Sequence, residues 1–205
     1  MLKIHHAPGT RGFRTIWACE ELGVPYEVIP VDMSRRFRAS STWRKMNPVG
    51  KVPVMSDGDL VMFESCAMTQ YVLDRYGEGR LQPRPGTSEH GTYLQWCWFA
   101  EATFSRPIGE IVNHRRSFAD AANDAVIDEM KERARLSAQA VEEALDGKTY
   151  LLGDDFSAAD INMGYTIKIF TSLVDENLSP NIAQYWARLT DRTAYGAAEA
   201  AEAGA

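Results

Sequence analysis

Cysteine is scarce in this chain, and long apolar runs are absent. Only three cysteines occur in 205 residues, Cys19, Cys66 and Cys97, and no two of them have Cys-x-x-Cys spacing. The odd count and this spacing argue against a disulfide framework and against a zinc site. No apolar run approaches the roughly 18 residues of a membrane-spanning helix, and the first residues lack the apolar region of a signal peptide. We therefore expect a cytoplasmic protein that binds no metal and no membrane.

The chain also lacks an excess of basic residues: it has 22 Lys and Arg against 28 Asp and Glu, a net charge of -6. Nucleic-acid binding favours a basic domain, so the composition argues against it. The charge is uneven: residues 1–80 carry 11 Lys and Arg against 9 Asp and Glu (+2), whereas residues 81–205 carry 11 against 19 (-8). We interpret one basic stretch in the first part either as a solvated face or as a site for a small anionic ligand. It comprises Arg35, Arg36, Arg38, Arg44, Lys45 and Lys51.

The first part of the chain predicts alternating strands and helices. Residues 2–6 alternate as a strand, a helical pattern follows until Gly23, and residues 26–31 alternate again. Val52-Pro53 then opens a short strand, Asp57-Gly58 predicts a hairpin turn, and residues 60–63 predict its partner strand. A helix is expected from Glu64-Ser65 to Tyr76. The order is βαβαββα.

The second part predicts helices alone. Glycines and prolines in residues 77–86 indicate a break, so we expect one domain at 1–80, a linker at 81–87 and an all-α domain at 88–205. A stripe at helical spacing predicts a long helix that ends at Gly147: Val126, Met130, Ala134, Ser137, Val141 and Leu145. The segment after Asp160 has apolar residues on every side, which predicts the buried central helix of the all-α domain. Ser157 and Asp160 form a capping box at the start of this helix. Residues 194–205 have little apolar periodicity and predict a frayed tail.

Three motifs, in order and at matching separations, resemble the glutathione S-transferase family. They are Asn47–Pro53, Glu64-Ser65 and Gly153–Asp160, the last with the pattern Gly-x-x-x-Ser/Thr-x-x-Asp. The resemblance covers nearly the whole chain and looks most like bacterial-type members with a serine or threonine active-site loop. It implies a thioredoxin-like α/β domain followed by an all-helical domain, glutathione as cosubstrate, conjugation to an apolar electrophile in detoxification, and a homodimer.

Within this resemblance, Thr10 is the expected catalytic residue. It lies four residues before Arg14, where serine-type members carry the hydroxyl that activates the glutathione thiol. A free thiol has a pKa near 8.5, and lowering it by two units requires about 2.7 kcal/mol of thiolate stabilisation, which one or two hydrogen-bond donors near a helix N-terminus can supply. Alternatively, Thr10 is only a helix cap. His5 and His6, at the place of the tyrosine of other members, are further candidates for contact with the thiolate.

The resemblance also implies which residues bind glutathione. Val52 and Pro53 pair with its peptide backbone, Ser65 and the start of its helix receive the α-carboxylate, and Glu64 takes the ammonium. Lys45 or Lys51 suits the glycyl carboxylate. Simple helix capping is the alternative for Glu64 and Ser65. Whether Val52-Pro53 is cis stays open.

Aromatic residues of the first helix of the all-α domain are the candidates for contact with the second, apolar substrate. The candidates are Trp96, Trp98, Phe99 and Phe104, beside a bend at Pro107. Core packing is the alternative for most of them. Two other functions remain open: a non-catalytic glutathione-binding module, and a glutathione-dependent reductase or isomerase. Cys66 at a helix start favours a reductase, but its position differs from that of the family's reductase cysteine, so we interpret it as a packing residue.

Overall fold

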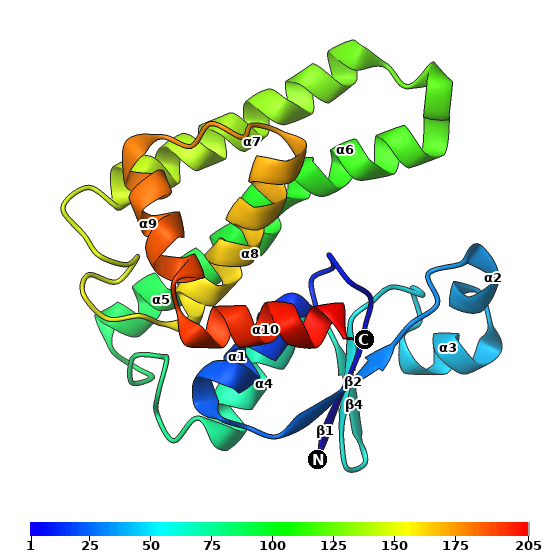
Figure 1. Ribbon diagram of the computed structural model, residues 1–205, viewed down its shortest axis with the longest axis horizontal. Helices are drawn as coiled ribbons and strands as arrows, with labels where there is room; N and C mark the ends of the chain where they lie inside the picture. Colours follow the sequence, from blue (N-terminus) through cyan, green and yellow to red (C-terminus); the bar gives the residue numbers. More distant parts are fainter. Residues whose placement is uncertain (205) are drawn as a thin grey trace. The chain divides into compact units, whose positions relative to one another are not determined.

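The computed structural model describes residues 1–204, which divide into two compact units. Among these residues, unit 1 comprises 1–81 together with the segment from 190 onward, and unit 2 comprises 82–189. Figure 1 colours the chain by sequence, from blue at the N-terminus to red at the C-terminus. Among the described residues, no helix is both long enough and apolar enough to cross a membrane.

Unit 1 is built on a four-stranded mixed sheet with the order β2-β1-β3-β4. Strand β1 pairs in parallel with β2 and antiparallel with β3, and β3 pairs antiparallel with β4. Ile4 lies opposite Val28 on one side and Met55 on the other. The strands are β1 (Leu2–His6), β2 (Tyr26–Pro30), β3 (Val54–Asp57) and β4 (Leu60–Phe63). Their order along the chain is the predicted one.

Four helices of unit 1 connect and follow these strands. Helix α1 supplies the crossover between the parallel strands, and it ends at Gly23, whose φ of 67° is a left-handed conformation that glycine adopts without steric cost. The four helices are α1 (Phe13–Leu22), α2 (Arg35–Arg38), α3 (Ser41–Met46) and α4 (Ser65–Tyr76). Ile16 and Trp17 of α1 and Met68 and Leu73 of α4 are fully buried, so both helices contribute to the core of unit 1.

The end of the chain differs from its sequence-based prediction. Instead of a frayed tail, residues 193–203 form helix α10 (Thr193–Ala203), which packs along α1, as Figure 1 shows. The Tyr195 ring contacts the rings of Phe13 and Trp17 at centroid distances of 5.4 and 5.0 Å. The buried residues of α10 are Tyr195, Ala198 and Glu202, and only Tyr195 is a large apolar residue, which explains why no apolar stripe is visible in the sequence. Ala205 lies outside the described residues.

Unit 2 consists of helices, as predicted. They are α5 (Ser88–Trp98), a π-helical segment (Phe99–Phe104), α6 (Ser105–Phe118), a 3-10 turn (Ala119–Ala121), α7 (Asp124–Ala144), α8 (Ala158–Leu173) and α9 (Pro180–Thr190). The predicted stripe of α7 is correct at Ala134, Ser137 and Val141, which are buried, but Ile127 is buried in place of the exposed Val126.

Helix α8 is the buried centre of unit 2, and its capping box is confirmed. Asp160 accepts hydrogen bonds from the backbone and side chain of Ser157 at 2.8 and 3.0 Å, from the Leu151 amide at 3.0 Å and from the Tyr185 hydroxyl at 2.8 Å. Burial raises the pKa of its carboxyl, and these hydrogen bonds act in the opposite direction. Asp160 therefore holds three segments of unit 2 together.

Candidate active site

The loop between β1 and α1 places the Thr10 hydroxyl between the Ala7 carbonyl and the His6 ring. Thr10 Oγ1 lies 2.7 Å from the carbonyl oxygen of Ala7, to which it donates, and 3.2 Å from Nδ1 of His6. The Thr10 amide also donates to the Ala7 carbonyl, at 3.2 Å, which closes a tight turn. The side chain is half-buried. Thr10 is thus held at the start of α1, and its hydroxyl proton can turn about the C–O bond toward a ligand.

His6 connects this loop to the C-terminal helix. Its ring is buried, and Nε2 lies 2.9 Å from Oε1 of Glu202, a residue of α10. The same carboxylate oxygen accepts the backbone N–H of Gly9 at 2.8 Å. Of the two histidines considered from the sequence, His6 is therefore the one in contact with Thr10. The His5 ring instead contacts Trp43 at 5.9 Å, and burial, with a smaller contribution from Lys3, lowers its pKa.

The start of α4 forms a second part of the site. Ser65 is buried at the first position of the helix, and its hydroxyl accepts a hydrogen bond from Nη1 of the buried Arg14 at 3.0 Å. Glu64, the preceding residue, is exposed and has a φ of 77°, an uncommon conformation for a residue with a side chain. Because a helix N-terminus attracts anions, Ser65 and the first turn of α4 can receive a carboxylate.

The Val52-Pro53 peptide bond is cis. Pro53 is buried beside α1, since a Cβ built at Gly12 would lie 3.1 Å from Pro53 Cβ. Val52 is half-buried against the cluster of Val31, Trp43 and Val54. Thr10, Pro53 and Ser65, which are distant in sequence, thus lie on segments that all contact the first turns of α1.

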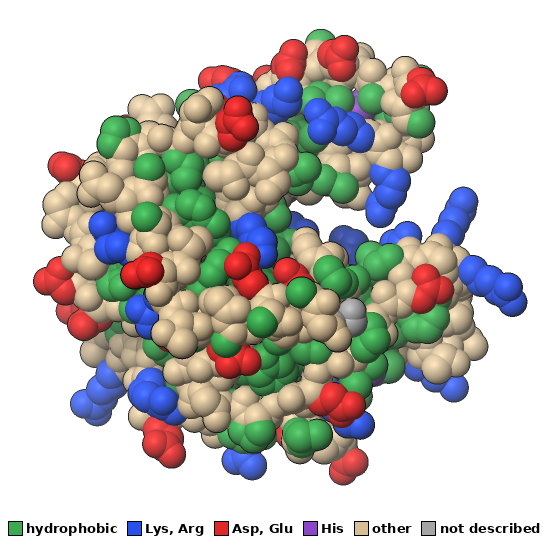
Figure 2. Space-filling view, viewed as in Figure 1, with side chains coloured by type: hydrophobic (Ala, Val, Ile, Leu, Met, Phe, Trp, Pro, Cys, Tyr) green, Lys and Arg blue, Asp and Glu red, His purple; other side chains and the backbone are tan. Residues whose placement is uncertain are grey.

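The residues of the basic stretch lie on the surface, and they differ in whether their side chains bond to the backbone of the fold. Arg44 is used within the fold, because its Nε donates to the Arg38 carbonyl at 3.1 Å. Lys45 at the end of α3 and Lys51 just before Pro53 are exposed. Figure 2 shows Lys and Arg side chains gathered where α2 and α3 lie in Figure 1. The two lysines stay available for an anionic group.

The three cysteines, Cys19, Cys66 and Cys97, are reduced thiols. No group of three or more His, Cys, Asp or Glu residues within residues 1–204 could hold a metal ion. Cys19 is buried, which raises the pKa of its thiol to about 12 and makes it a poor nucleophile. Cys66, at the second position of α4, is partly exposed.

The aromatic candidates in unit 2 differ in exposure. Phe104 is fully buried and packs against Phe170 at 5.3 Å, as a core residue does. Trp96 is almost fully buried, and its ring contacts the half-buried Phe99 at 5.3 Å. Trp98 points outward, with 66% of its surface exposed. Phe99 lies in the π-helical segment, an irregularity that frequently marks functional sites.

Comparison with known proteins identifies the family. The model of the glutathione S-transferase N-terminal domain matches residues 1–74, and that of the C-terminal domain matches residues 102–192. A probable glutathione S-transferase from rice is 31% identical over 91% of this chain and 89% of its own length. The chain belongs to the glutathione S-transferase family. A maize glutathione S-transferase is 32% identical over 88% of this chain and 83% of its own length.

A solved structure agrees in fold. The glutathione transferase URE2P8 from Phanerochaete chrysosporium, solved with oxidized glutathione, superimposes with a TM-score of 0.89 over 99% of this chain and 95% of its own, at 23% identity. The predicted family and fold class are therefore confirmed. The subtype is corrected, because these relatives of the transferase are plant and fungal proteins rather than bacterial ones.

Sequence reasoning missed Glu202, Gly12 and the contact of Arg14 with Ser65. Glu202 follows Tyr195 and Ala198 at intervals of three and four residues, the spacing of one helical face, and all three are buried. That spacing is the only sequence signal for Glu202. Gly12 and Arg14 carry no such signal, because their roles depend on tertiary contacts. Gly12 lies against His6 and Pro53, and Arg14 bonds to Ser65.

Proposed function

We propose that this glutathione S-transferase conjugates glutathione, through its thiolate sulfur, to an apolar electrophile, with Thr10 as the residue that stabilises the thiolate. The observation that carries the proposal is the position of the Thr10 hydroxyl in the loop before α1, half-buried and within 3.2 Å of two acceptors. A hydroxyl donor near a helix N-terminus stabilises a thiolate, which is the nucleophile of the reaction.

We assign the glutathione contacts to segments around the first turns of α1. The γ-glutamyl carboxylate binds Ser65 and the start of α4, and Glu64 pairs with the ammonium. The peptide backbone binds along Val52 and Pro53, and Lys45 or Lys51 binds the glycyl carboxylate. The buried Arg14 supports this arrangement, because its hydrogen bond to Ser65 fixes the serine hydroxyl and adds positive charge beneath the expected anion.

The apolar substrate is proposed to contact Phe99, with Trp96 packed behind it. Phe104, a candidate from the sequence, is omitted because its buried side chain serves the core. We also propose a cytoplasmic homodimer. Exposed apolar residues support the dimer: Val61 and Phe63 on the edge strand β4 are 46% and 38% exposed.

A non-catalytic binding module is the second candidate, because the Thr10 hydroxyl donates to the Ala7 carbonyl at 2.7 Å and must release it to reach a sulfur. Retention on immobilised glutathione together with turnover of a chlorinated aromatic compound supports the transferase. Retention without turnover of a panel of electrophiles, including peroxides and disulfides for reductase activity, supports the module. Failure to bind glutathione at all contradicts both.

A further inference from the structure

Glu202 is a buried acidic residue that the proposed role of Thr10 does not use. It reaches the active-site loop from the last turn of α10, where it accepts the Gly9 amide at 2.8 Å and lies 2.9 Å from Nε2 of His6. Its side chain is only 10% exposed. A buried carboxylate is costly unless it is paired, and both of these contacts help to stabilise it at this position.

The contacts of Glu202 define which nitrogen of His6 carries a proton. A carboxylate only accepts hydrogen bonds, so Nε2 of His6 is the donor in the 2.9 Å contact. In the neutral imidazole, Nδ1 then has a free lone pair. Nδ1 is the atom that lies 3.2 Å from the Thr10 hydroxyl. The three side chains thus form a chain of carboxylate, imidazole and hydroxyl, in the order used to activate nucleophiles.

Gly12 leaves the space that the His6 ring needs in this series of three side chains. A Cβ at position 12 would lie 2.4 Å from His6 Nδ1, a distance that no real contact tolerates. Only a residue without a side chain allows the imidazole to approach the first turn of α1. The positive end of a helix stabilises a nearby thiolate but disfavours an imidazolium. The Glu202 carboxylate offsets that effect on the opposite side of the ring.

Helix α10 is anchored well before its last turn. Arg192 forms two hydrogen bonds with Glu21 of α1, and Tyr195 packs on Phe13 and Trp17. These contacts fix the helix axis, so Glu202 is delivered to His6 by a rigid element.

We propose that Glu202 and His6 act through Thr10 as a proton relay that retains the proton of the glutathione thiol when the thiolate forms. The S–H bond breaks and its proton bonds to Thr10 Oγ1, while the hydroxyl proton of Thr10 bonds to the lone pair of His6 Nδ1. The products are a thiolate and an imidazolium, and the imidazolium pairs with Glu202. Only protons move, so no atom changes its oxidation state. The imidazolium then donates to Thr10, and Thr10 donates to the sulfur. The proton returns to solvent when the product leaves.

This inference rests on the proposed function, and in it His6 and Glu202 are positioning residues that do not touch the sulfur. The Thr10 proton must turn from the Ala7 carbonyl to Nδ1. Because both acceptors lie within 3.2 Å of Oγ1, the turn needs only rotation about the C–O bond.

The first test counts protons in the wild-type protein. Glutathione binding at pH 7 is measured by calorimetry in buffers of different ionisation enthalpy, and the bound thiolate is measured by its ultraviolet absorbance. The relay predicts that fewer protons are released than thiolates are formed. Release of one proton for each thiolate overturns it. This measurement needs no variant, so it decides the question even where a substituted protein does not fold.

The second test uses Glu202→Gln, which keeps the shape of the side chain but removes its charge. We expect the pKa of the bound thiol to rise by about one unit, with conjugation at pH 7 about tenfold slower, recovery at alkaline pH and little change in glutathione affinity. Glu199→Gln, at an exposed position on the same helix, is the matched control: its side chain accepts the Tyr195 hydroxyl at 3.1 Å, which the glutamine amide oxygen can also do, so this variant should behave as wild type.

A double variant tests the route through Thr10. In the Thr10→Ala background, Glu202→Gln should have no further effect on the bound thiol. Additive effects, or an unchanged thiol in Glu202→Gln alone, overturn the relay. These outcomes differ from failure of the proposed function, in which the wild type itself forms no thiolate.

Discussion

Arg192 and Glu21 form a two-pronged ion pair that joins the start of α10 to α1. Arg192 Nε lies 2.6 Å from Oε1 of Glu21, and Nη2 lies 2.7 Å from Oε2. The Glu21 side chain is 8% exposed, and it also accepts the indole N–H of Trp17 at 2.9 Å. Because the guanidinium matches the carboxylate at both oxygens, the pair fixes direction as well as distance.

Loss of this pair should loosen α10 and leave the Glu21 carboxylate without its cation. We expect Arg192→Ala to lower the free energy of unfolding by about 1.5–3 kcal/mol. Arg192→Lys should recover only part of it, since a lysine cannot bind both oxygens. Chemical denaturation measures the stability, and hydrogen exchange of the α10 amides measures the local opening. Equal exchange in Arg192→Ala and wild type would show that apolar packing alone holds the helix.

Thr10 supplies the most direct test of the catalytic assignment. Thr10→Ala should raise the pKa of bound glutathione by about one to two units, and so slow conjugation at neutral pH about tenfold to a hundredfold, because the thiolate loses its hydroxyl donor. Glutathione affinity should remain largely intact. Titration of the thiolate absorbance in the bound state is the measurement.

Thr10→Ser is the control, since it keeps the hydroxyl and removes only the methyl group. It should keep the pKa of the bound thiol low. If Thr10→Ala also leaves that pKa unchanged, the hydroxyl only closes the turn with Ala7, and His6 or a backbone N–H must stabilise the sulfur.

Gly12 should tolerate no side chain. Gly12→Ala brings a methyl group to within 2.4 Å of His6 Nδ1, so the imidazole or α1 has to move. We expect a loss of about 1–3 kcal/mol of stability and a bound thiol with a raised pKa. Thermal unfolding and thiolate titration measure the two effects. Gly196→Ala, in α10 where nothing lies within 4 Å, should instead gain roughly 0.5–1 kcal/mol.

The sequence was informative wherever the signal is local. The Ser157 capping box, the Asp57-Gly58 turn and the alternation of residues 2–6 each specify their structure through neighbours a few residues away. Glu202 could not be predicted in this way, because its partners His6 and Gly9 are 196 and 193 residues distant. Helix α10 gives no apolar stripe, so it resembles a solvated tail until its contacts with α1 are known.

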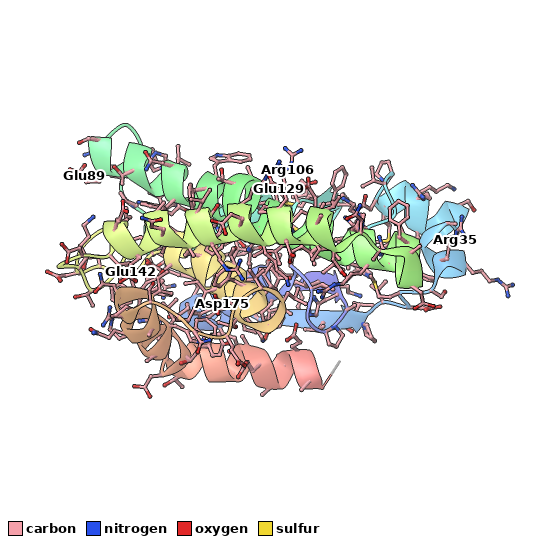
Figure 3. The ribbon with its side chains drawn as sticks, turned by 90° about the horizontal axis from the view of Figure 1, so that it is seen from above. Arg35, Glu89, Arg106, Glu129, Glu142 and Asp175 are labelled. Atoms are coloured by element: carbon pink, nitrogen blue, oxygen red, sulfur yellow. The ribbon has the colours of Figure 1, made fainter. Side chains whose placement is uncertain are left out.

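The start of α9 depends on a carboxylate from α7. Glu142 accepts hydrogen bonds from the Ser179 hydroxyl at 2.6 Å and from the amides of Asn181 and Ile182 at 3.0 and 2.9 Å, and Figure 3 labels it beside that helix. Burial alone would raise its pKa, but the hydrogen bonds outweigh this and lower it below the ordinary value of 4.5.

This lowered pKa predicts a pH-dependent contribution to stability. Since the folded state favours the ionised form, the contribution is fully present above about pH 4.5 and is lost as the pH falls below that value. Glu142→Gln should therefore lower stability by about 1–2 kcal/mol at pH 7 and by little in strong acid. Thermal unfolding at a series of pH values measures this difference. Glu143→Gln, at an exposed neighbour, should show no such dependence; a constant difference for Glu142→Gln would contradict the assignment.

The proposed homodimer can be held by charge or by apolar contact, and the two causes respond differently to salt. Residues 1–80 carry +2 and residues 81–205 carry -8, so two-fold pairing of opposite charges is physically reasonable. Such an association weakens as salt rises, because the screening length is about 8 Å at physiological ionic strength. The exposed Val61 and Phe63 on β4, an edge strand, favour instead an apolar contact that is nearly indifferent to salt.

We expect the apolar contact to dominate, because partly exposed ion pairs contribute only about 0–1 kcal/mol each. Burial of apolar surface contributes roughly 25 cal/mol per Å², and several exposed apolar side chains, Val61 and Phe63 among them, can contribute together. Val61→Lys should therefore convert the dimer to monomer at micromolar concentration, and high salt should not. Sedimentation equilibrium at low and high salt measures both. Lys3→Glu, at an exposed site on β1, is the control and should leave the dimer intact. A dimer that dissociates in salt and survives Val61→Lys would assign the association to charge, and a wild-type monomer would exclude both causes.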